Sequence, residues 1–121
     1  MKLCALRGAT TVEENSAEAI LAGTEELVAA VLESNSLEPD RLVSCIFTVT
    51  DDLDAEFPAV AARGLGLEHV PLLCAREIPV PGALARVIRV LVHCYLPAEA
   101  EPRHVYLREA QRLRADLEHA Q

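Results

Sequence analysis

A ten-residue apolar run, VIRVLVHCYL at residues 87–96, constrains the fold more than any other segment of the chain. Its length and its β-branched residues predict a strand. Because side chains alternate along a strand, Arg89 shares one face with Leu91 and His93, and both faces read as apolar and buried. An unpaired guanidinium in such a strand would be strongly destabilising. Arg89 is therefore expected either to form a structural ion pair or to lie in a pocket that stays wet until an anionic ligand binds.

The rest of the chain predicts strands and helices mixed in one domain. Further strands are expected at residues 2–8, 42–50, 69–80 and 103–107, and helices from Asn15, within residues 55–66 and from residue 108 onward. The spacing of Asn15 and Glu18 is typical of a helix start, and apolar residues from Ile20 to Leu32 recur at helical spacing. The fold class is therefore α+β or α/β, in a single domain over residues 1–121.

Composition and charge argue against several classes of function. The net charge of −8 is opposite to the basic patch of a nucleic-acid-binding protein. No apolar run approaches the roughly 20 residues of a membrane span, and the N-terminal segment is too short for a secretory signal. The four cysteines are far apart, as expected for reduced thiols in a cytoplasmic protein, and with the four histidines they match no familiar metal site. Eight of the ten arginines lie from Arg63 onward, so a local basic pocket is still possible.

Other polar residues interrupt the predicted strands and strengthen the case for a ligand at Arg89. Arg7 closes the first strand just before Gly8, and Glu77 interrupts the third. Tyr106 lies in the last strand, where a phenol hydroxyl usually needs a partner, although such a tyrosine is more often a core residue. Two arginines, a carboxylate and a phenol on one small sheet would suit a polar ligand that carries carboxylates.

Four segments, taken in order, resemble the monofunctional chorismate mutases of the AroH class. They are LRGATTVEENS (6–16), FTVTDDLDAEFPAVAAR (47–63), VPLLCAREIPVPGALARVIRVL (70–91) and RHVYLREAQRLRADL (103–117). The resemblance implies a homotrimer with a pseudo-α/β-barrel fold and with active sites between neighbouring subunits. It also implies the Claisen rearrangement of chorismate to prephenate, which leads to phenylalanine and tyrosine, without a cofactor or a metal.

The same resemblance implies roles for the polar residues in the strands. Arg7 would hold a substrate carboxylate, and Tyr106 would add a hydrogen bond to one. Arg89 would reach the ether oxygen and a carboxylate together. Glu77 would accept a hydrogen bond from the ring hydroxyl, assisted by the backbone near Cys74.

Four further residues would complete the site by the same resemblance. Phe57 and Arg63 would come from the neighbouring subunit, and Leu113 and Arg114 would close the site from the C-terminal segment. The chain departs from the family pattern at Val60, where some members carry a lysine.

A second departure, Ala115 in place of a proline, lies in the C-terminal segment.

Two other kinds of protein compete with the mutase interpretation. A non-catalytic trimeric module that binds small carboxylates would keep the arginines but would not need Glu77 or the closing segment. Small trimeric deaminase-like enzymes also bind ligands between subunits, but their sequences lack RGATTVEE and CAREIPVPG.

Overall fold

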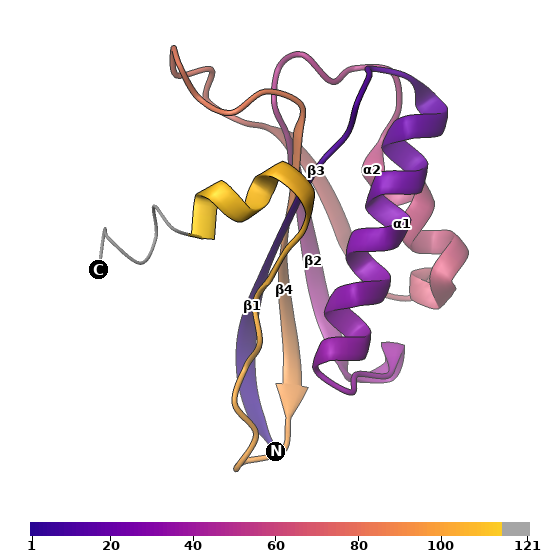
Figure 1. Cartoon of the computed structure of the whole chain (residues 1–121). Helices are drawn as coiled ribbons and strands as arrows, with labels where there is room; N and C mark the ends of the chain where they lie inside the picture. The colour runs from indigo at the N-terminus through magenta and orange to yellow at the C-terminus, as the bar shows by residue number, and fades with distance from the viewer. Residues whose placement is uncertain (115–121) are drawn as a thin grey trace.

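The computed structural model describes residues 1–114, and its centre is one five-stranded mixed sheet (Figure 1). The strands are β1 (Lys2–Thr11), β2 (Leu42–Val49), β3 (Leu72–Arg76), β4 (Val87–Leu96) and β5 (Val105–Tyr106), in the spatial order β3-β2-β4-β1-β5. The apolar run that forms β4 is the central strand, and it pairs antiparallel with both β1 and β2. The short strands β3 and β5 pair parallel with β2 and β1 at the two edges.

The helices α1 (Ala17–Ser34) and α2 (Pro58–Ala62) lie on the same side of this sheet (Figure 1). Short helical turns follow at η1 (Pro39–Arg41), η2 (Arg63–Leu67) and η3 (Arg108–Ala110), and residues 111–114 are helical. No helix within residues 1–114 is long and apolar enough to cross a membrane. The mixed α+β class that the sequence predicts is confirmed.

The N-cap of helix α1 is one residue later in the chain than the sequence indicates. Ser16 is the N-cap, and its Oγ accepts a hydrogen bond from the backbone N–H of Ala19 at 3.1 Å. Asn15 has a different role, because its Oδ1 accepts from the backbone N–H groups of Asp54 and Ala55. The expected cap at Asn15 is therefore wrong, since this side chain links the start of α1 to the segment after β2 instead.

The core lies between α1 and the sheet, and glycine allows the two to approach closely. Buried apolar side chains of α1, such as Leu27 and Val31, face the buried side of β1 and β4. A Cβ at Gly8 would lie 3.0 Å from side-chain atoms of Val31 and Val90, closer than most such contacts. This close approach sets α1 directly behind the part of β1 that carries Arg7.

The opposite face of the sheet is not covered by a helix within the described part of the chain (Figure 1). Along β4, Ile88 and Val90 are buried beneath the helices, whereas Arg89 is exposed and Leu91 is half-buried. The expected burial of both faces of β4 is therefore wrong for the single chain. We call the uncovered side the open face.

The strand expected at residues 69–80 is also shorter than predicted, at Leu72–Arg76. Prolines 79 and 81 follow it closely, and proline has no N–H with which to continue a ladder. The chain instead forms a loop over residues 77–86 before β4.

Candidate active site

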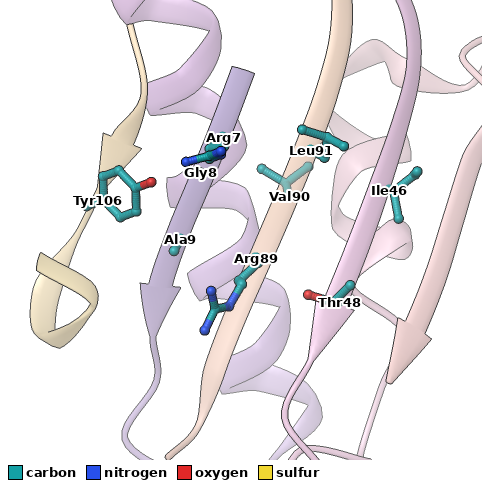
Figure 2. A pocket seen from close by; sticks show the side chains of 9 residues that line it. All are labelled: Arg7, Gly8, Ala9, Ile46, Thr48, Arg89, Val90, Leu91 and Tyr106. Atoms are coloured by element: carbon teal, nitrogen blue, oxygen red, sulfur yellow. The ribbon is translucent and has the colours of Figure 1, made fainter. Parts of the chain in front are cut away.

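Three of the predicted site residues, Arg7, Arg89 and Tyr106, line one pocket of about 370 Å³ on the open face. They come from three adjacent strands, β1, β4 and β5. In the sheet register Ala9 pairs with Arg89 on one side and with Tyr106 on the other, so these side chains share one face. Figure 2 shows the guanidinium of Arg89 and the ring of Tyr106 on either side of the short Ala9 side chain. Ala9 thus leaves space between a cation and a phenol.

Arg89 is held in place by Glu77, the fourth residue of the predicted set. Arg89 Nε lies 3.0 Å from Glu77 Oε2, and the same oxygen accepts a hydrogen bond from Thr48 Oγ1 at 2.8 Å. The Arg89 side chain is 44% exposed and that of Glu77 is 17% exposed. Because the ion pair engages Nε, the terminal amino groups can still meet a ligand. The first alternative raised for Arg89, an ion pair, is therefore confirmed; Arg89 also lines a pocket, and its binding of an anionic ligand stays a prediction.

Two hydrogen bonds hold the end of the loop before β4 close to this ion pair. The backbone N–H of Arg86, a residue with a φ of 52°, donates to Asp52 Oδ2 at 2.9 Å. The backbone N–H of Val87 donates to Thr50 Oγ1 at 3.0 Å. These bonds fix the start of the strand that carries Arg89. A smaller pocket of about 170 Å³, lined by Glu77 and this loop, adjoins the first pocket at Arg89.

Sequence reasoning did not identify His104 as a partner of the site. Its Nδ1 accepts a hydrogen bond from the backbone N–H of Arg7 at 3.0 Å, so the imidazole extends the contact between β1 and β5. Burial and, to a smaller extent, the charge of Arg7 lower the pKa of His104, which favours the neutral ring that can accept this bond. The two residues are 97 positions apart, and no local pattern points to the pair.

The other predicted site residues do not line the pocket that holds Arg7. Cys74 pairs with Phe47 in the sheet register and, with Phe57, lines a separate pocket of about 330 Å³ beside the start of α2. Phe57 is 67% exposed, and Arg63 is exposed at the first position of η2.

Leu113 and Arg114 lie in the helical residues after η3, and they too are absent from the lining of the Arg7 pocket. A single described chain thus brings Arg7, Glu77, Arg89 and Tyr106 together. Within residues 1–114, no three His, Cys, Asp or Glu side chains gather in a way that could hold a metal ion.

Known proteins match this chain over nearly its whole length. The family model "Chorismate mutase type I" matches residues 3–117. The chain is 55% identical over 118 residues to chorismate mutase AroH of Thermus thermophilus, covering 96% of this chain and 97% of the relative. It is 41% identical over 120 residues to chorismate mutase AroH of Bacillus subtilis (strain 168), covering 97% and 94%.

A solved structure of a chorismate mutase from Clostridium thermocellum superposes with a TM-score of 0.86 at 47% identity. The match covers 90% of this chain and 98% of that one. Sequence and fold agree, and the chain belongs to the type I chorismate mutase family.

Proposed function

We propose that this chain is a chorismate mutase that catalyses the Claisen rearrangement of chorismate to prephenate, on the route to phenylalanine and tyrosine. We propose further that residues 1–121 form one mutase domain. Family membership supports the activity, and one structural observation supports the assignment of this activity to particular residues. Arg7, Arg89 and Tyr106 surround one pocket on the open face, and Glu77 holds Arg89 there.

Arg7 and Tyr106 are proposed to bind and orient the substrate. Chorismate is a dianion, and its reacting form is a compact diaxial conformer. A guanidinium can grip a carboxylate with two hydrogen bonds, and the phenol can add a third. Holding the two reacting ends of the substrate close together removes much of the entropic barrier. Arg7 and Tyr106 line the pocket together with the small residues Gly8 and Ala9, a placement that suits substrate binding.

Arg89 is proposed to act on the breaking bond. As the C–O bond breaks ahead of C–C bond formation, negative charge develops on the ether oxygen. A fixed cation stabilises this transition state more than the substrate, which raises the rate. The bond from Arg89 Nε to Glu77 Oε2 supports such preorganisation. Glu77, with the backbone near Cys74, is proposed to accept the ring hydroxyl of the substrate.

The reaction makes and breaks bonds within one molecule, so the proposed mechanism uses no cofactor and no metal. It also transfers no proton to or from the enzyme. We therefore expect a rate that is nearly flat across neutral pH. A bell-shaped pH profile with a solvent isotope effect would contradict this mechanism.

We propose that the protein is a cytoplasmic homotrimer of the pseudo-α/β-barrel type, in which Phe57 and Arg63 complete the site of a neighbouring subunit. Two observations support this assembly. Phe57 is a largely exposed aromatic side chain, and the open face leaves large apolar side chains such as Leu3 and Leu73 exposed. Exposed apolar groups of this kind are typical of surfaces that bind another protein.

The activity is tested by following the loss of chorismate absorbance and the formation of prephenate. A non-catalytic carboxylate-binding module would bind chorismate through Arg7 and leave it unchanged. That result would refute the proposed function.

The shared site has a separate test. Subunits carrying Arg63→Ala are mixed with subunits carrying Arg89→Ala, and each variant alone is expected to be nearly inactive. If Arg63 and Arg89 of one site come from different chains, mixed trimers contain some intact sites and activity returns. Mixed trimers that form without any return of activity would refute the shared site.

A further inference from the structure

The C-terminal segment leaves the sheet at Arg108, two residues after the end of the short strand β5. Arg108 has a φ of 52°, in the left-handed region that residues with a Cβ rarely adopt. A residue in this conformation is stable only where its surroundings hold it there. The contacts of Arg108 therefore decide how the segment leaves the sheet.

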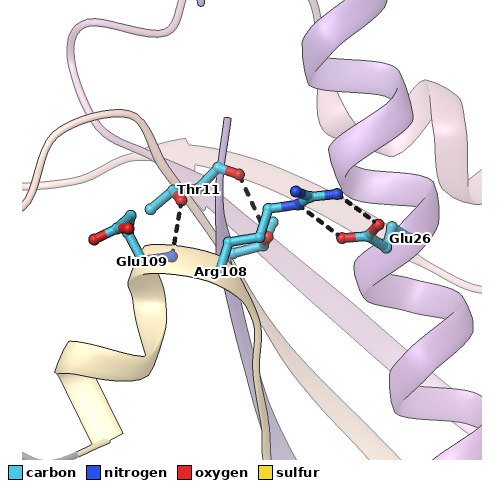
Figure 3. A network of polar contacts seen from close by, with 5 residues as sticks. Thr11, Glu26, Arg108 and Glu109 are labelled. Carbon is cyan, nitrogen blue, oxygen red and sulfur yellow. Dashed lines mark hydrogen bonds and ion pairs between the residues drawn. The ribbon is translucent and has the colours of Figure 1, made fainter. Parts of the chain in front are cut away.

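The side chain of Arg108 is joined to Glu26 on α1 by two parallel hydrogen bonds (Figure 3). Arg108 Nε donates to Glu26 Oε1 at 3.1 Å, and Nη2 donates to Oε2 at 2.9 Å. This two-point geometry fixes direction as well as distance. The two residues are 82 positions apart, so the ion pair links the end of the sheet to the helix behind it.

The backbone next to Arg108 is docked on β1 at the same time. The N–H of Leu107 donates to the carbonyl of Ala9 at 2.9 Å, and the N–H of Glu109 donates to Thr11 Oγ1 at 3.2 Å. Ala110 is fully buried. Figure 3 shows the Arg108 side chain reaching toward α1 while the helical turn that follows runs away from α1. Arg108 is thus the point about which the segment changes direction.

We propose that Arg108 and Glu26 are positioning residues for substrate binding. Their ion pair fixes the turn at Arg108, and so holds Tyr106 against the pocket and sets the direction of the residues that include Leu113 and Arg114. This inference rests on the proposed function. Neither residue lines the pocket that holds Arg7, so both act through the segment and not on the substrate itself.

The shortness of β5 explains why an exposed ion pair matters here. Pairs as exposed as Arg108 and Glu26, at 57% and 46%, usually add little to global stability. The strand before Arg108 has only two residues paired with β1, however, and segments with few contacts open locally before the protein unfolds. Breaking the pair should therefore loosen the segment without unfolding the protein.

A pocket of about 560 Å³ beside this turn is lined by three arginines that could bind an anion, Arg86, Arg108 and Arg112, but also by the carboxylates Glu13 and Glu109. Each arginine already has a partner. Arg108 is paired with Glu26 and Arg112 with Glu109, and Arg86 Nε donates to the carbonyl of Val12. The arrangement therefore favours an anchoring role over an anion site.

The test compares KM and kcat for chorismate in full-length variants. Glu26→Gln and Arg108→Gln should each raise KM by about three- to fivefold, because the exposed pair is of modest strength, and leave kcat within about twofold. The double charge reversal Glu26→Arg with Arg108→Glu should restore KM toward the original value. Arg108→Gly keeps the left-handed turn without the guanidinium, and it should raise KM as Arg108→Gln does.

Arg112→Gln is the matched control. This substitution breaks the ion pair between Arg112 and Glu109 in the same segment but leaves the link to α1 intact. The side chains of Arg112 and Glu109 are even more exposed than those of Arg108 and Glu26, at 71% and 61%. This variant should keep the original KM, and the melting temperatures of all variants should stay close together.

Three outcomes would overturn the inference: an unchanged KM in Glu26→Gln, no recovery in the charge-reversed pair, or a normal KM in Arg108→Gly. The last result would mean that the backbone turn alone positions the segment. These failures are distinct from a failure of the proposed function. An unsubstituted protein that does not consume chorismate refutes the function, whereas normal turnover with unaffected variants refutes the role of the ion pair alone.

Discussion

Replacing Arg89 by citrulline separates the charge of this side chain from its shape. Citrulline has nearly the same outline as arginine and keeps the Nε–H that faces Glu77, but it is neutral. If the charge stabilises the ether oxygen in the transition state, kcat should fall by about 10²-fold or more, as when a comparable oxyanion donor is removed. That loss corresponds to about 2.7 kcal/mol of transition-state stabilisation. KM should change far less, because Arg7 can still hold a carboxylate.

The stability of the protein should change much less than its rate. The ion pair has a 3.0 Å separation, but the Arg89 side chain is 44% exposed, and Thr48 still donates to Glu77 when the charge is gone. With solvent screening, the loss should be about 1 kcal/mol or less. Unfolding entropy of about 2.1 cal/mol/K per residue gives about 0.25 kcal/mol/K for this chain, so the melting temperature should fall by about 4 °C or less.

The assay combines steady-state kinetics with thermal unfolding of the same samples. Citrulline at Arg41 is the control, because this residue lies in η1 and lines neither the pocket that holds Arg7 nor the pocket beside α2. The control should keep its kcat. An unchanged kcat with citrulline at Arg89 would refute the role assigned to its charge, and a large loss of stability would mean that the ion pair had been misjudged.

Three further predictions concern other parts of the chain. Deleting the residues from Leu113 onward should mainly raise KM, because Leu113 and Arg114 are proposed to cover bound substrate away from the breaking bond; a loss confined to kcat would contradict this. Burial raises the pKa of Cys45 from 9.0 to about 11, so the unfolded thiol ionises first and the free energy of unfolding should fall as pH rises from 9 toward 11. Urea unfolding at several pH values measures this change, and the free energy of unfolding should fall less steeply with pH in Cys45→Ala. An unchanged dependence on pH would exclude this thiol as the cause. Gly23→Ala should lower the melting temperature although alanine favours helices by about 1 kcal/mol, because its Cβ would lie 2.5 Å from Val12 Cγ1. The additional substitution Val12→Ala should relieve that clash, and a more stable single variant would refute the argument.

The main elements of the fold could be predicted because their signals are local. The run at residues 87–96 is β4, and the apolar spacing after residue 16 is that of α1. Local signals fail where competing partners decide the outcome. Asn15 is an equally good cap in sequence, but the backbone N–H groups of Asp54 and Ala55 engage it, and Ser16 caps the helix.

The site was predictable to a similar extent. The sequence indicates that Arg89 needs a partner, but it cannot distinguish an ion pair from a pocket, and the structure has both. Apolar residues on both faces of a strand indicate that both faces are shielded from water. They do not indicate whether the same chain or another chain covers each face. The contacts of Arg7 with His104 and of Arg108 with Glu26 span 97 and 82 positions, so they depend on the tertiary fold and no local pattern indicates them.

The open face of the sheet would make the protein sensitive to its own concentration if the proposed trimer forms. If other copies of the chain cover that face, folding is linked to association, and mass action then governs both stability and the number of complete sites. The melting temperature should rise with protein concentration, and activity per chain should fall on strong dilution. A cell that makes little of this protein would then have proportionally fewer working sites than its chain count implies.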